Sequence, residues 1–155
     1  MPARGPAANG ARRLSRMTAG YSGTPLPRKL GIKPGHRLAL VAAPDGFLGG
    51  TLGPLPEGVE IAAGLDGHVD VAVVFVTAVA ELTETLPALA AATAPDGAIW
   101  VAWPKRASRV PTDMSEDRVR DVALPTGLVD TKVCAIDATW SGLRLSLRRE
   151  LRRKR

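Results

Sequence analysis

Residues 69–92 read VDVAVVFVTAVAELTETLPALAAA and hold a predicted strand followed directly by a predicted helix. Residues 69–76 are β-branched or aromatic apart from Asp70 and Ala72, which is typical of a strand. Thr77 is a predicted N-cap for a helix that ends near Ala92. One stripe of that helix is apolar, at spacings of three and four residues: Val79, Leu82, Leu86, Leu89 and Ala90. A strand followed by an amphipathic helix is the repeating unit of α/β folds.

Shorter segments on both sides extend this unit. Further strands are predicted at 37–43, 59–62, 98–103, 129–137 and 143–149. A short helical turn over 24–31, a turn or half-helix within 47–56, a turn at 94–97 and a helix from Asp113, with Glu116 at N3, to Leu124 are also predicted. The last two strands are joined by a short loop and should pair antiparallel. The predicted fold is therefore a single Rossmann-like three-layer α/β domain, with a mostly parallel sheet of about six strands and a C-terminal antiparallel hairpin.

Length and composition suit one domain. The chain has 155 residues, of which 45% are hydrophobic and 23% charged, which is ordinary globular usage. Cys134 is the single cysteine, so an intramolecular disulfide is excluded. No stretch approaches the roughly 18 to 20 apolar residues of a membrane span, and we expect a cytoplasmic protein that makes no membrane contact. The expected organisation is a disordered basic tail over 1–20, the α/β domain over 21–149 and a basic tail over 150–155.

The positive charge is concentrated at the two ends of the chain. The formal net charge is +6, but residues 1–16 carry +4 and residues 148–155 carry +5. The body between them, with 11 basic and 14 acidic residues, carries −3. Nucleic-acid binding, if present, is therefore expected from the tails and not from the folded domain.

Two parts of the sequence resemble known protein families. From Asp70 onward, a strand, an Ala-rich helix, the segment LPALAAATAPDGAIWV (86–101) and a closing hairpin resemble the second half of class I methyltransferases. Nearly the whole body is similar to a family of small, largely actinobacterial proteins without an established activity. The matching motifs are GYSGTPLPRKLGIKPG (20–35), APDGF (43–47), WPKRASRVPTD (103–113) and LPTGLVDTKVCAIDATWSGLRL (124–145). Neither resemblance supplies a catalytic residue.

The turn after the first strand departs from a cofactor-binding pattern. Rossmann-like enzymes use a Gly-rich turn there, so that the backbone can approach the cofactor, and an acidic residue after the second strand for the ribose. Here the turn holds Pro44, which lacks an N–H donor, and only Gly46 allows close approach. Ala62-Ala63-Gly64 stands where an acid is wanted, with Asp66 as a poor substitute. The sequence therefore predicts no bound cofactor.

Four loops should still meet at the carboxyl ends of the strands, where open α/β sheets bind ligands. They are 44–47, Thr77, 103–109 and 137–142. The candidate ligand-binding residues in these loops are Asp45, Gly46, Thr77, Lys105, Arg106, Arg109, Asp137, Trp140 and Ser141. Lys105, Arg106 and Arg109 suit a phosphate or carboxylate, and Trp140 suits stacking.

Each of these residues also has a purely structural interpretation. Asp45 and Asp137 can cap turns, Trp140 can pin the hairpin to the body, and the three cations can form a solvated loop. Trp100 and Trp103, at odd separation in one strand, should point to opposite faces as core residues. His36 and His68 lie at strand entrances on the opposite edge, which disfavours them as bases for hydrolysis. Two histidines and one distant cysteine also predict no metal site.

Three hypotheses about function follow, and the sequence favours binding over catalysis. The first is a methyltransferase-like scaffold without a recognisable cofactor loop that binds a small anionic ligand or a protein partner. The second is a nucleic-acid-associated or ribosome-associated protein that uses its Arg-rich tails. The third is a divergent S-adenosylmethionine-dependent methyltransferase.

Overall fold

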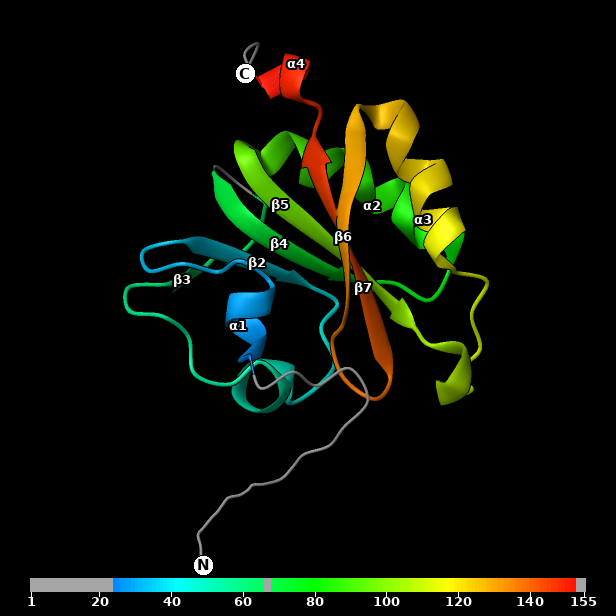
Figure 1. Cartoon of the computed structure of the whole chain (residues 1–155), viewed down its shortest axis with the longest axis horizontal. Coiled ribbons are helices and arrows are strands. Elements are labelled where there is room, and N and C mark those ends of the chain that lie inside the picture. Colours follow the sequence, from blue (N-terminus) through cyan, green and yellow to red (C-terminus); the bar gives the residue numbers. More distant parts are fainter. Residues whose placement is uncertain (1–23, 66–67, 153–155) are drawn as a thin grey trace, which may run out of the picture.

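The computed structural model describes residues 24–65 and 68–152, and these form one six-stranded sheet flanked by helices (Figure 1). The strands are β2 (Arg37–Val41), β3 (Glu60–Ile61), β4 (Val69–Phe75), β5 (Thr93–Pro104), β6 (Leu128–Ala135) and β7 (Trp140–Leu147). Their order is β3-β2-β4-β5-β7-β6. The first four in this order pair in parallel, whereas β7 lies antiparallel between β5 and β6. The predicted α/β fold, mostly parallel sheet and terminal hairpin are confirmed.

The described residues also form seven helical segments, the first of which precedes β2. They are α1 (Leu26–Lys29), the π-helical turn η1 (Phe47–Thr51), α2 (Val79–Ala92), the 3-10 turns η2 (Arg106–Ser108) and η3 (Leu124–Thr126), α3 (Glu116–Ala123) and α4 (Arg149–Arg152). The short turns at α1 and η1 match the predicted helical turn and half-helix. Between β2 and β3 the glycines and prolines leave room for nothing longer than η1.

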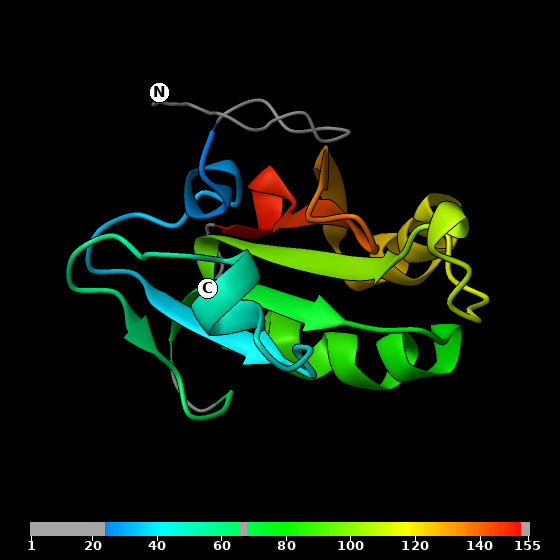
Figure 2. The same ribbon diagram turned by 90° about the horizontal axis from the view of Figure 1, so that it is seen from below.

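The two faces of the sheet carry separate hydrophobic cores. Figure 2 shows α2 and α1 on opposite sides of the sheet. The apolar stripe of α2, with Leu82, Leu86 and Leu89 fully buried, packs on one face together with α3. The other face is covered by α1, η1 and the loops around them. Trp103 belongs to the first core and Trp100 to the second, so the prediction that they point to opposite faces is confirmed.

The caps of α2 and α3 differ from the prediction. Helix α2 begins at Val79, and Thr77 lies before it without capping it. Instead, the Glu81 carboxylate accepts hydrogen bonds from the backbone N–H groups of Thr77 (2.9 Å) and Ala78 (3.2 Å). Asp113, predicted to cap α3, accepts a hydrogen bond from the Val79 N–H at 2.9 Å and so caps α2. The cap of α3 is Ser115, whose hydroxyl accepts from the N–H of Arg118 at 3.2 Å.

The predicted turn at 94–97 is also wrong in form, because the extended chain of β5 already starts at Thr93. Val69 pairs with Thr93, whereas Val71 pairs with Ala98, so β5 carries extra residues at this bulge. A Cβ atom added to Gly97 would lie 2.6 Å from the Asp70 carbonyl oxygen. Pro95-Asp96-Gly97 therefore forms a bulge within a strand and not a connection between elements.

The described residues leave out the predicted basic N-terminal tail and end at Arg152. The N-terminal tail, with its predicted disorder and nucleic-acid binding, lies outside the described residues. At the C-terminus, α4 continues the described chain to Arg152. Across residues 24–65 and 68–152, no helix combines the length and the apolar character required to span a bilayer.

Candidate functional site

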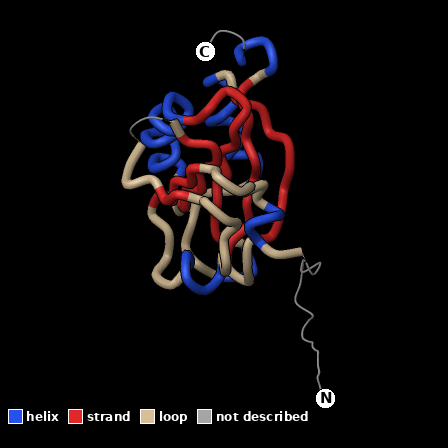
Figure 3. Tube along the Cα trace, turned by 90° about the vertical axis from the view of Figure 1, so that its left-hand side faces the viewer, coloured by secondary structure: helices blue, strands red, loops and turns tan. Residues whose placement is uncertain are grey.

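The candidate site lies where the strand order reverses. From β2 the chain moves outward to β3, then returns to place β4 on the other side of β2 and continues to β5. In open parallel sheets, such a reversal opens a crevice at the carboxyl ends of the two central strands. Here those ends are Val41 in β2 and Phe75 in β4. In Figure 3 the loops, drawn in tan, gather mainly at one end of the array of strands.

The turn after β2 has a backbone shaped for close approach. Ala42 has a φ of 59° and Gly46 a φ of 81°, both in the left-handed region. A non-glycine residue rarely adopts this conformation, and such residues collect at functional sites. A side chain added at Gly46 would meet no atom within 4 Å. Asp45 is exposed between Pro44 and Gly46, so this turn presents a carboxylate beside open space.

The segment after β4 has its backbone donors already engaged. Glu81 accepts from the N–H groups of Thr77 and Ala78, and the Thr77 carbonyl accepts a hydrogen bond of 2.6 Å from the Thr112 hydroxyl. Thr77 therefore lies at the carboxyl edge of the sheet, as predicted, but its backbone N–H and carbonyl are bonded to Glu81 and Thr112.

A row of aromatic rings links the turn after β2 to the hairpin tip. Phe47 and Phe75 contact edge to face with centroids 4.9 Å apart, and Phe75 and Trp140 do so at 5.1 Å. Phe47 and Phe75 are buried, whereas Trp140 is half-buried. The sequence places Phe47 in the predicted loop 44–47 but singles out neither phenylalanine, because one aromatic residue in a Gly-rich turn or in an apolar strand gives no ligand signal. Trp140 thus packs on the body, as its structural interpretation predicts, and still offers part of its indole surface.

The hairpin tip joins the same edge. Asp137 accepts hydrogen bonds from the N–H groups of Thr139 and Trp140, each at 2.8 Å, and therefore caps the turn. The Lys105 N–H donates to the Thr139 carbonyl at 2.7 Å, which fixes the loop after β5 beside the tip. Ser141 is half-buried within β7, opposite Trp103. Asp137 therefore stabilises the turn through its hydrogen bonds, and the position of Ser141 is set by the pairing of β7 with β5.

Three cations stand in the loop after β5. Lys105 is half-buried, and Arg106 and Arg109 are exposed. In the part of the chain that the structure describes, none of their side chains forms an ion pair. Arg109 has a φ of 62° and ends η2, so the backbone reverses there. The structure thus leaves all three cations available at the carboxyl edge.

Metal-binding residues do not gather at this edge. His36 and His68 precede β2 and β4 at the amino ends of these strands, on the opposite edge, as predicted. Within the described ranges, no group of three or more His, Cys, Asp or Glu side chains is arranged to hold a metal ion.

The turn after β2 offers some of the groups that would bind an adenosine-containing cofactor and lacks others. The left-handed Ala42, the open space at Gly46 and the exposed Asp45 carboxylate suit a ligand with hydroxyl or amino donors. Pro44 supplies no N–H, and its carbonyl accepts from the Phe47 N–H at 3.1 Å. Residues 62–65 after β3 contain no carboxylate. To such a ligand the turn therefore offers the Asp45 carboxylate and open backbone, and no Gly-rich phosphate-type loop.

Comparisons with known proteins agree with this architecture. No protein-family model and no curated protein matches the chain. Among solved structures, it is similar to the ribosomal protein L11 methylase of Lactobacillus delbrueckii subsp. bulgaricus, with a TM-score of 0.53 and 14% identity over 77% of this chain and 73% of that one.

Two further solved structures show the same likeness. A fibrillarin pre-rRNA processing protein of Methanococcus jannaschii gives a TM-score of 0.52 and 11% identity over 75% of this chain and 68% of that one. The magnesium protoporphyrin IX methyltransferase of Synechocystis, solved with bound SAH, gives 0.51 and 13% over 74% of each chain. These likenesses establish a methyltransferase-type Rossmann-like fold.

Proposed function

We propose that this chain is a divergent S-adenosylmethionine-dependent methyltransferase that binds its cofactor at the crevice between β2 and β4. The observation that carries the proposal is the turn after β2, where Ala42 and Gly46 are left-handed and Asp45 is exposed beside open space. The turn stands at the strand reversal, where sheets of this class bind ligands. The methyltransferase-type fold supports this hypothesis.

The chain's own residues have distinct roles in this proposal. Asp45 would accept hydrogen bonds from ligand hydroxyl or amino groups, because an ionised carboxylate is an acceptor only. Gly46 would let the ligand approach the backbone. Trp140 would offer its half-exposed ring for stacking. When bound, S-adenosylmethionine supplies an activated methyl group to an acceptor.

Calorimetric titration of the full chain with S-adenosylmethionine and S-adenosylhomocysteine tests this function. We expect saturable binding of both ligands, and Asp45→Asn should weaken it about tenfold, as loss of a charge-assisted hydrogen bond predicts. Asp96→Asn is the matched control, because Asp96 is an exposed carboxylate in the bulge at the amino edge. Absence of binding at millimolar ligand, or equal effects of the two variants, would contradict the proposal.

A second candidate function is binding of a small anion without a cofactor, favoured by the three cations at 105–109. Lys105, Arg106 and Arg109 form no ion pairs within the described residues and stand beside the hairpin tip. This function predicts that inorganic phosphate or citrate raises the melting temperature of the full chain. Combined substitution of these three cations by Gln should abolish that rise, and a rise that persists in the variant rejects this candidate.

A further inference from the structure

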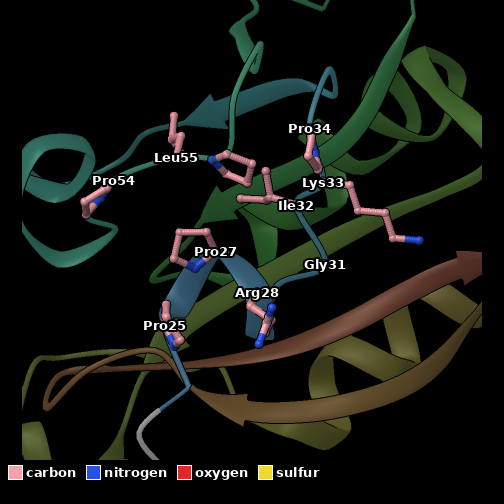
Figure 4. A pocket seen from close by; sticks show the side chains of 10 residues that line it. Pro25, Pro27, Arg28, Gly31, Ile32, Lys33, Pro34, Pro54 and Leu55 are labelled. Carbon is pink, nitrogen blue, oxygen red and sulfur yellow. The ribbon is translucent and has the colours of Figure 1, made fainter.

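A separate groove lies on the face covered by α1, between α1, the segment that follows it and the loop after η1 (Figure 4). Its volume is about 660 Å³. Five of its lining residues are prolines: Pro25, Pro27, Pro34, Pro54 and Pro56. Such a volume is within the range of roughly 300 to 1,000 Å³ that is usual for small-molecule sites. The groove shares no lining residue with the crevice between β2 and β4.

The walls of this groove are rigid and apolar. A proline ring fixes φ near −65° and removes the backbone N–H donor, so these five residues offer hydrocarbon surface with little conformational freedom. Ile32 is buried beneath the groove, and Leu55 packs at its side. Because the proline walls have little conformational freedom to lose, binding of an apolar body would cost little entropy. Hydrogen-bond donors must come from other lining side chains.

Those donors are two cations at the rim, Arg28 and Lys33. Both are exposed, and neither forms an ion pair within the described chain. Figure 4 shows Arg28 on the α1 side and Lys33 extending away from the prolines at one end of the groove. No carboxylate is among the described residues that line it. Apolar walls with a positive rim are complementary to an apolar body with an anionic head.

A polar cleft of about 190 Å³ adjoins the groove, because Gly31 and Lys33 line both. His36 and Arg144 also line this cleft, together with Asp70 and Asp96. Asp70 is already engaged: it accepts from the Arg37 N–H at 2.8 Å and lies 3.4 Å from His68 Nε2. The Lys33 end of the groove therefore opens toward a polar cleft whose lining carries both positive and negative side chains.

We propose that this groove binds an amphipathic organic anion, with an apolar or aromatic body against the prolines and an anionic head at Arg28 and Lys33. The N-terminal tail is a poor occupant by charge, because residues 1–16 carry +4 and would meet two cations. The proposed site is independent of methyl transfer, since its residues are distinct from those of the turn after β2.

A fluorescence titration of the full chain with two dyes tests this site. The dye anilinonaphthalene sulfonate has an aromatic body and one anionic head, and phenylnaphthylamine has a similar body without the charge. We expect saturable binding of the sulfonate and its displacement by decanoate, which is another amphipathic anion. Arg28→Gln combined with Lys33→Gln should weaken sulfonate binding about tenfold and leave phenylnaphthylamine binding unchanged.

Two controls make the result specific. Arg106→Gln combined with Arg109→Gln removes the same charge at the carboxyl edge and should leave sulfonate binding unchanged. Leu55→Asp should weaken both dyes, because it places a carboxylate in the apolar wall. All four cations are exposed, so melting temperatures should stay close to that of the parent protein.

Absence of saturable sulfonate binding overturns the proposal, and so does equal weakening by the two charge-removing variants. A failure of S-adenosylmethionine binding leaves this test intact, because Arg28→Gln with Lys33→Gln leaves the turn after β2 unaltered. Conversely, these two substitutions should leave an S-adenosylmethionine titration unchanged.

Discussion

The ring of Trp140 contacts the ring of Phe75 edge to face, with centroids 5.1 Å apart, and so joins the hairpin tip to the end of β4. Trp140→Ala should lower the free energy of unfolding by about 2 kcal/mol, less than for a fully buried aromatic because Trp140 is half-exposed. Urea denaturation measures this change. Trp140→Phe, which keeps a ring at this position, should lose less than half as much, and an equal loss would show that ring contact is not the cause.

Trp100 is fully buried and donates a hydrogen bond from Nε1 to the Leu30 carbonyl at 2.9 Å. Trp100→Phe leaves that carbonyl without its donor and opens space beside α1, so we expect a loss of about 2 to 3 kcal/mol. Trp103→Phe is the comparison, because Trp103 packs on the other face without such a bond in the described chain. If Trp103→Phe destabilised the protein more than Trp100→Phe in thermal unfolding, the role assigned to the hydrogen bond between Trp100 and the Leu30 carbonyl would be wrong.

Asp113 caps α2 from a loop 34 residues further along the chain. Asp113→Ala should destabilise the protein by about 1 kcal/mol, the usual effect of losing an N-cap acceptor. Asp121→Ala removes an exposed carboxylate from α3 without removing a cap and should change stability by less than about 0.5 kcal/mol. Chemical denaturation of both variants makes the comparison, and indistinguishable midpoints would refute the capping role.

Arg120 ties helix α3 to strand β6. Its Nε donates to the Asp130 carboxylate at 2.8 Å, and its other nitrogens contact Glu116 and Asp117. The hydrogen bond from Arg120 lowers the pKa of Asp130 below its ordinary value of 3.8. A lowered pKa contributes stability that is present above about 3.8 and is lost as the pH falls through the lower value of the folded state.

Asp130→Asn should therefore reduce stability at pH 7 and flatten its fall on acidification below pH 4. Melting temperatures from pH 7 down to pH 2.5 give the two slopes. Parallel curves for the parent and the variant would mean that Asp130 titrates alike in the folded and unfolded chains.

Cys134 is half-buried in β6, and burial raises the pKa of its thiol although Lys29 and Lys132 act in the opposite direction. The thiolate is the reactive form, so alkylation of the native protein at pH 7.5 should be slow and should accelerate strongly at higher pH. Iodoacetamide labelling followed by mass spectrometry measures the rate, with the denatured chain as the reference. Equal rates for native and denatured protein at pH 7.5 would contradict a protected thiol.

The sequence predicted the sheet because its strongest signals are local. Residues 69–76 are β-branched or aromatic apart from Asp70 and Ala72, and the apolar stripe of α2 recurs at helical spacing, so composition and periodicity predict both elements. The antiparallel hairpin followed from a loop too short for a crossover. These features depend on neighbours within a few residues.

The errors came from contacts that are distant in the chain. The sequence predicts that Asp113 caps the nearer helix, α3, but its carboxylate accepts a hydrogen bond from the Val79 N–H at the start of α2. Residues 94–97 contain turn-forming residues, but the pairing of Val69 with Thr93 and of Val71 with Ala98 makes them a bulge within β5. Phe47 and Phe75 gave no sequence signal for their contact with each other. The proline-lined groove was missed because its lining residues come from two segments that alone resemble ordinary loops.

Chemical-shift mapping on the isotope-labelled full chain determines whether S-adenosylmethionine binds in the crevice between β2 and β4. We expect added S-adenosylmethionine to shift the amide signals of the non-proline residues in 42–46 and of Val76 and Thr77, with smaller changes at Trp140. Unchanged spectra at millimolar ligand, or shifts confined to residues outside this edge, would contradict it.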